Sequence, residues 1–295
     1  MIYERIAANK YKSLALVIFF VAFVLFLGYV LGELFWGPGF GSIALIIAVV
    51  ISSITALASY YYSDSIVLKI SSARLLSRKE FPFLWHSIEG LAIAAGIPVP
   101  KAYIIEDSAP NAFATGRDPK HAVICVTTGL LQKLNRQELE GVIGHEMSHI
   151  KNYDIRLMTM TVVLVGVIAL ISDMILRSFF WGRHDKRDLG KAGIILIVIG
   201  IVLAVLAPVI ATIIKLAISR KREFLADADS ALLTRYPAGL ASALEKISKD
   251  KEPLEAANKA TEHLYIVNPL TKSSLNNMFS THPSIEDRVK ALKTM

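Results

Sequence analysis

Long uncharged stretches alternate with mixed polar segments along this chain, and the apolar stretches come in two pairs. The first pair covers residues 14–31 and about 43–62, and neither stretch contains a charged side chain. At a rise of about 1.5 Å per residue in a helix, each stretch is long enough to cross a bilayer. The second pair covers 157–176 and 192–214, and Asp173 interrupts its first member. Whether this second pair spans the membrane or forms an incompletely spanning hairpin is left open.

The segment after the first pair predicts a small sheet with helices around it. Apolar residues recur at helical spacing over 84–95, and Gly96 ends that pattern. Short β-branched runs at 102–106 and 122–126 are strand candidates. The run 122–126 could also present a free strand edge, to which an extended peptide would add by main-chain pairing.

Further helices follow on both sides of the second apolar pair. Asn135 and Glu138 have the spacing of a capping box, and the helix that they start continues to about residue 150. Residues 215–235 and 240–247 are helical by periodicity, and Ser284 is a suitable N-cap for a last helix. The pattern therefore favours an α+β fold in a multi-pass membrane protein.

Four segments are expected from these boundaries. Residues 1–63 form a membrane region with two transmembrane helices, and 64–156 form the first part of a catalytic domain. Residues 157–214 hold the two further apolar segments, and 215–295 form the second part of the catalytic domain.

Composition supports a membrane protein with one compact soluble part. The chain is 54% hydrophobic and 19% charged, with a mean hydropathy of +0.49. The net charge of +7 does not indicate nucleic acid, because the basic residues cluster beside the apolar stretches. Lys and Arg flank the first pair on its outer sides and are absent from the loop 32–42. The positive-inside rule then places the soluble part in the cytoplasm, at the cell (inner or plasma) membrane.

The sequence HEMSH carries the candidate chemistry. His145 and His149 are four residues apart, so on a helix they lie on one face and can bind one metal ion. Glu146 projects beside them, where it can reach a water molecule without being a ligand. Two His ligands with a Glu general base are typical of zincin-like zinc peptidases, with one Zn²⁺ per chain.

A catalytic zinc usually has three protein ligands, and Glu223 is the candidate for the third. Asp227 lies on the same helix face, where it could accept a hydrogen bond from the outer N–H of a ligand histidine. The alternative is a solvated helix face whose acidic residues pair with Lys221 or Arg222. His282 is a candidate second donor to a tetrahedral oxyanion, although by spacing alone an ordinary surface histidine fits equally well.

Five stretches of the chain together resemble the HtpX group of membrane zinc metallopeptidases, which is related to the CAAX prenyl-protein endopeptidases. These stretches are PNAFATG, ICVTTGLL, HEMSHIKNYD, REFLADADSALLT and THPSIEDRV. The resemblance covers nearly the whole chain and implies a mainly helical gluzincin domain with a small sheet. It also implies zinc bound by His145, His149 and Glu223, with Glu146 catalytic.

By the same likeness, Asn111 would contact the substrate backbone and His282 would help to stabilise the transition state. The implied activity is cleavage of misfolded or damaged membrane proteins during stress, so the expected partners are polypeptides and the lipid bilayer. Two alternatives remain. One is a protease that matures a single peptide, and the other is a non-catalytic scaffold with a structural zinc.

Overall fold

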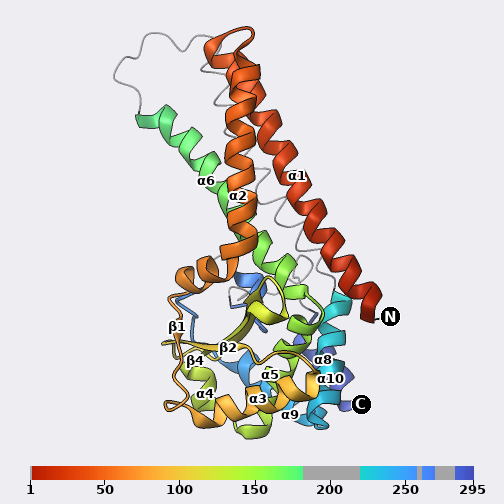
Figure 1. Ribbon diagram of the computed structural model, residues 1–295. Coiled ribbons are helices and arrows are strands. Elements are labelled where there is room, and N and C mark those ends of the chain that lie inside the picture. The colour runs from red at the N-terminus through yellow and green to blue at the C-terminus, as the bar shows by residue number, and fades with distance from the viewer. Residues whose placement is uncertain (1, 182–219, 258–260, 270–282) are drawn as a thin grey trace.

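The computed structural model describes residues 2–181, 220–257, 261–269 and 283–295. Two long helices, α1 and α2, stand on a mixed part that contains the sheet, and α6 leaves the same part at an angle to them (Figure 1). The start of α1 lies beside α8, a helix of the mixed part (Figure 1). The chain thus begins close to the helices that carry the candidate site.

Helices α1 (Ile2–Trp36) and α2 (Phe40–Ile70) form an antiparallel hairpin. Two glycines of α1 allow the helices to pack closely. A Cβ added at Gly28 would lie only 2.7 Å from Ala48 Cβ, and one added at Gly32 only 2.6 Å from Ala44 Cβ, so a larger residue would not fit at either position. Among the described residues, the helices long and apolar enough to cross a membrane are Ile6–Glu33 and Phe40–Ile70. Their outward apolar side chains, such as Phe26 and Ile46, are exposed and suit a lipid environment.

The four-stranded sheet has the order β1-β2-β4-β3. Its strands are β1 (Arg74–Leu75), β2 (Lys101–Ile105), β3 (Ala112–Gly116) and β4 (Ala122–Thr127). β4 pairs with β2 in parallel and with β3 antiparallel, so Cys125 has Tyr103 on one side and Phe113 on the other. The expectation that 122–126 presents a free edge is therefore wrong. The strand at that side of the sheet is β3.

The other helices surround the sheet and confirm most of the predicted ones. They are α3 (Pro82–Ala95), α4 (Thr128–Lys133), α5 (Arg136–Lys151), α6 (Asp154–Trp181), α8 (Arg220–Thr234), α9 (Pro237–Lys249) and α10 (Ile285–Lys293), with 3₁₀ turns at Pro119–His121 and Glu262–Leu264. The capping box of Asn135 and Glu138 is present at the start of α5.

Helix α5 lies in the middle of the mixed part, between β3 and the helices α3, α8 and α9. Two glycines allow its neighbours to approach. A Cβ at Gly141 would lie 2.7 Å from the backbone nitrogen of Leu240, and one at Gly144 would lie 2.8 Å from Ser230 Oγ. Ser230 Oγ also donates a 2.7 Å hydrogen bond to the Gly141 carbonyl. This close approach brings His145 and His149 of α5 against the acidic residues of α8.

The chain bends by 81° between α5 and α6. Tyr153 adopts a φ of 60° at the bend, a left-handed conformation that is uncommon for a residue other than glycine. The predicted segment 157–176 falls within α6, which packs against α1 and α2. The segment 192–214 lies outside the described residues. Because of the bend, Asp154 at the start of α6 is folded back toward the end of α5.

Candidate metal centre

Three buried side chains from two helices converge on one point. His145 and His149 come from α5, and Glu223 comes from α8; each is at most 5% exposed. The two histidine Nε2 atoms lie 3.1 Å apart. His145 Nε2 is 3.6 Å from Glu223 Oε2, and His149 Nε2 is 3.5 Å from Glu223 Oε1. Among the described residues, this trio is the cluster that could hold a metal ion.

The geometry of the trio fits zinc. Ligand atoms at about 2.0–2.1 Å around a tetrahedral zinc lie about 3.3 Å from one another. His145 Nδ1 is 2.9 Å from Asp227 Oδ1, and His149 Nδ1 is 3.0 Å from Asp154 Oδ2. An aspartate accepts a hydrogen bond from Nδ1 of each histidine, so each Nε2 is the ring nitrogen that faces Glu223. Burial lowers the pKa of His145 to about 4. Burial also lowers the pKa of His149, but its hydrogen bond to Asp154 and the charge of Glu223 outweigh this and raise it to about 9, so a metal would displace a proton from His149. Two imidazole nitrogens and the Glu223 carboxylate thus converge in a buried space that a metal ion could occupy, with Arg288 Nη1 3.5 Å from Glu223 Oε2.

An arginine supports the carboxylate behind His145. Arg288 on α10 donates from Nε to Asp227 Oδ2 at 2.8 Å and from Nη2 to Oδ1 at 2.6 Å, and both residues are 0% exposed. Burial would raise the pKa of the Asp227 carboxyl, but Arg288 and His145 hold it below its usual range. Asp227 therefore stays a carboxylate that can accept a hydrogen bond from His145 Nδ1–H.

A second arginine and an asparagine support the carboxylate behind His149. Arg222 Nη1 lies 3.0 Å from Asp154 Oδ1. Asn9 on α1 donates from Nδ2 to the same oxygen at 2.6 Å. The other oxygen of Asp154 is then the one that accepts from His149.

Glu146 sits between the trio and the sheet. It is 2% exposed, and the backbone N–H of Ala114 on β3 donates to its carboxylate. Burial raises the pKa of Glu146 to about 7. A neighbouring divalent cation would lower this value, because it stabilises the carboxylate form. A carboxyl with a pKa in this range can both accept and return a proton.

The predicted substrate contact lies at the start of β3, next to a segment of the chain itself. Asn111 Nδ2 donates to the Val267 carbonyl at 2.9 Å, and the Ile266 N–H donates to the Ala112 carbonyl at 3.0 Å. Arg288 Nη1 donates to the Ile266 carbonyl at 3.0 Å. Residues 266–267 thus run antiparallel to β3 along its outer edge. His282 lies outside the described residues, and its role stays a prediction.

Comparison with known proteins identifies the family to which this chain belongs. The family model "Peptidase family M48" matches residues 79–295, which is most of the chain. The chain belongs to peptidase family M48. It is therefore a metalloprotease that acts on polypeptides, and the family implies a bound metal, typically zinc.

The sequences of curated relatives match this chain almost from end to end. It is similar to proteins named "Protease HtpX homolog", with 50% identity in Dictyoglomus thermophilum over 99% of this chain and 94% of the relative. A homologue from Listeria monocytogenes serotype 4a is 43% identical over 100% of both chains. The crystal structure of S. mikatae Ste24p shares the fold, with a TM-score of 0.50 at 22% identity over 98% of this chain and 67% of that one. The resemblance to the HtpX group is thus confirmed.

Sequence patterns missed three residues that surround the M48 site. Asp154 and Arg288 stand inside the stretches HEMSHIKNYD and THPSIEDRV, so a search for charged residues within these motifs would have found them. Asn9 belongs to no motif, and no local pattern distinguishes it from other polar residues of the first helix. It is found only because the fold brings it to Asp154.

Proposed function

We propose that this protein is a membrane-embedded zinc endopeptidase that hydrolyses peptide bonds of misfolded or damaged membrane proteins. In this proposal His145, His149 and Glu223 bind zinc, and Glu146 is the general base. The observation that carries it is the convergence of two histidine Nε2 atoms and the two Glu223 carboxylate oxygens, all buried, at distances of 3.1–3.6 Å. Glu146 lies on the same helix as both histidines.

When bound, zinc supplies Lewis acidity, which lowers the pKa of a water molecule and polarises a carbonyl group. The Glu146 carboxylate accepts a proton from the attacking water as the water oxygen bonds to the carbonyl carbon. The C–N bond then breaks, and Glu146 returns the proton to the leaving amine. The Ala114 N–H fixes the carboxylate on the side of the sheet. His282 is the proposed further donor to the oxyanion.

An extended substrate is proposed to bind along the outer edge of β3. Ile266 and Val267 already make the contacts that such a substrate would make: the Ile266 N–H donates to the Ala112 carbonyl, and the Asn111 side chain donates from Nδ2 to the Val267 carbonyl. A substrate that uses Asn111 must therefore displace Val267. β-strand addition supplies affinity through the backbone and is compatible with many sequences, which suits a protease for damaged proteins.

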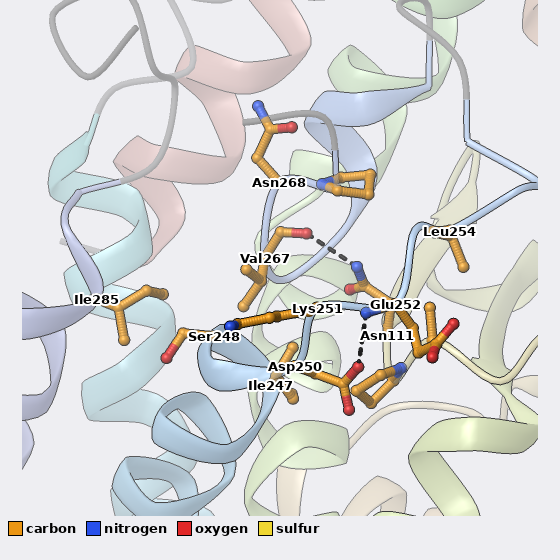
Figure 2. A pocket seen from close by; sticks show the side chains of 13 residues that line it. Asn111, Ile247, Ser248, Asp250, Lys251, Glu252, Leu254, Val267, Asn268 and Ile285 are labelled. Carbon is orange, nitrogen blue, oxygen red and sulfur yellow. Dashed lines mark hydrogen bonds between the residues drawn. The ribbon is translucent and has the colours of Figure 1, made fainter. Parts of the chain in front are cut away.

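The direction of β3 supports a proposed orientation for the substrate. A chain antiparallel to β3 runs from its Gly116 end, where β3 contacts α2 and α6, to its Asn111 end. Beside Asn111 lies a pocket of about 500 Å³ (Figure 2). The described lining includes apolar Leu254, Val267 and Ile285 and charged Asp250, Lys251 and Glu252. The N-terminal part of the substrate would thus come from the membrane side, and its C-terminal part would reach the pocket.

The membrane arrangement is part of the same proposal. Residues 1–63 would anchor the protein by α1 and α2, with 64–156 and 215–295 as the two parts of one cytoplasmic catalytic domain. Segment 157–214 would return the chain to the membrane between them. The support is the apolar exposed surface of α1 and α2 and the position of basic residues beyond their outer ends.

The decisive test is Glu146→Gln in the full-length protein. We expect it to retain zinc, because Glu146 is no ligand, and to lose cleavage of an unfolded membrane substrate, because no base remains. Zinc content is measured by atomic emission, and cleavage by mass spectrometry of the products. Glu140→Gln is the matched control, since Glu140 lies on the same helix in an ion pair with Arg136.

Turnover by the Glu146→Gln protein would refute the mechanism, and loss of zinc would refute the ligand assignment. The substrate class is tested by quantitative proteomics of cells that lack the protein. Accumulation of many damaged membrane proteins is expected. One accumulating precursor, with no general effect, would contradict the quality-control role.

A further inference from the structure

Asn9 is a buried polar residue near the start of α1, a helix whose sequence predicts only a membrane anchor. It is 2% exposed. Its amide nitrogen donates to the Asn152 carbonyl at 2.8 Å and to Asp154 Oδ1 at 2.6 Å, and its amide oxygen accepts from Arg222 Nη2. One side chain thus joins α1, the turn between α5 and α6, the start of α6, and α8.

The contacts of Asn9 lead directly to a candidate metal ligand. Asp154 uses Oδ1 for Asn9 and Arg222 and uses Oδ2 for His149 Nδ1. A carboxylate held at one oxygen cannot rotate freely, so its other oxygen keeps a fixed position. That oxygen sets the orientation of the His149 ring and the availability of its Nε2.

The chemistry of an amide suits this position. Asp154 already has a cationic partner in Arg222, and a further positive charge would compete for it. Asn is neutral, and it can donate to two oxygens while it accepts from a guanidinium. The amide nitrogen and oxygen of Asn9 both have hydrogen-bond partners, as buried polar atoms require, and Arg222 Nη1 adds an ion pair to Asp154 Oδ1. Next to Asn9, Lys10 Nζ lies 4.7 Å from the centre of the Tyr153 ring, so α1 contacts the same turn a second time.

We propose that Asn9 is a positioning residue for His149, acting through Asp154, so that docking of the first membrane helix completes the metal site. This inference rests on the proposed zinc-peptidase function. The family match begins at residue 79 and so does not include Asn9. In this arrangement the membrane anchor and the metal centre are parts of one hydrogen-bonded unit.

The test measures zinc affinity of the full-length protein in lipid nanodiscs, by competition with a chromogenic chelator. Asn9→Leu keeps the volume and removes the amide, and Asn9→Ser is a milder second variant. Both should weaken zinc binding by about threefold to tenfold, less than the ~10–100-fold typical of a direct partner of a ligand such as Asp154. Ser13→Ala is the control, because it removes a 2.9 Å bond within α1 to the Asn9 carbonyl and leaves Asp154 untouched.

A double variant distinguishes positioning from general support of the fold. If Asn9 acts through Asp154, Asn9→Leu combined with Asp154→Asn should bind zinc as weakly as Asp154→Asn alone. Cobalt(II) spectra should also change in the Asn9 variants, because the orientation of His149 changes. The proposal is overturned if both Asn9 variants bind zinc within twofold of wild type, or if the two effects add in full. Failure of the wild type to bind zinc would instead refute the proposed function.

Discussion

His145 and His149 each present Nδ1 to a buried aspartate, and in both cases an arginine lies against that aspartate. Behind His145 the pair is Asp227 and Arg288, with both side chains fully buried. Behind His149 the pair is Asp154 and Arg222, and the Arg222 side chain is 14% exposed. The first support lies wholly among the helices around the sheet. The second is completed by the first membrane helix.

This difference in burial indicates that the Asp154 side of the site tolerates substitution better than the Asp227 side. A fully buried cation that loses its partner cannot be solvated, whereas one near the surface can recover part of its hydration. We therefore expect the Asp227 side to respond strongly to any loss of charge. The Asp154 side should respond in smaller steps, because three partners share its carboxylate and Arg222 can reach water.

The largest effect is expected from Arg288→Met. The substitution leaves the Asp227 carboxylate buried without its cation, and breaking such a pair costs about 3–5 kcal/mol. Thermal unfolding in detergent should shift to a much lower temperature, and zinc affinity should fall because Asp227 no longer holds the His145 proton in place. Both quantities are measured on the full-length protein.

The matched control for this variant lies on the same helix. Lys293→Met removes an ion pair with Glu245 in which both side chains are exposed, and exposed pairs contribute little to stability. We expect no measurable shift. Equal melting temperatures for the two variants would show that the buried guanidinium is unimportant and would contradict the comparison.

The next effect separates the two aspartates directly. Asp227→Asn and Asp154→Asn each weaken the hold on one histidine, so zinc affinity should fall by about 10–100-fold in each. We expect Asp227→Asn near the upper end of this range, because the buried Arg288 then has the candidate ligand Glu223, 3.5 Å away, as its nearest countercharge and competes with the metal for it. Asp154→Asn should be near the lower end. Chelator competition measures both, and the reverse order would refute the unequal burial argument.

The sequence predicted the centre of this site and Asp227 beside it, but it missed Asp154, Arg288 and Asn9 for a physical reason. His145, Glu146 and His149 are recognisable because helical geometry places residues four apart on one face. Glu223 and Asp227 share a face in the same way. The supports are long-range contacts: His145 and Arg288 are 143 residues apart, and Asn9 and Asp154 are 145 apart. Local periodicity carries no information about such pairs.

The prediction that residues 122–126 present a free strand edge was wrong for a related reason. The β-branched run of β4 was recognised as a strand, but strand order depends on partners elsewhere in the chain. β3 consists largely of small residues, such as Ala112, Ala114 and Gly116, which resembles a turn more than a strand. It forms a strand because β4 pairs with it and because α5 and α6 pack against it. Small side chains there allow the backbone to lie close to Glu146.

The smallest effect is expected from Arg222→Met. Asp154 keeps Asn9 as a donor, and the 14% exposure of Arg222 reduces the worth of its ion pair with Asp154. Loss of about one hydrogen bond predicts a zinc affinity weaker by about twofold to fivefold. Lys221→Met, at an exposed neighbouring position, should leave the affinity unchanged. A loss as large as that of Asp154→Asn would mean that Arg222, and not Asn9, fixes the carboxylate, and the membrane helix would then matter less than its contacts indicate.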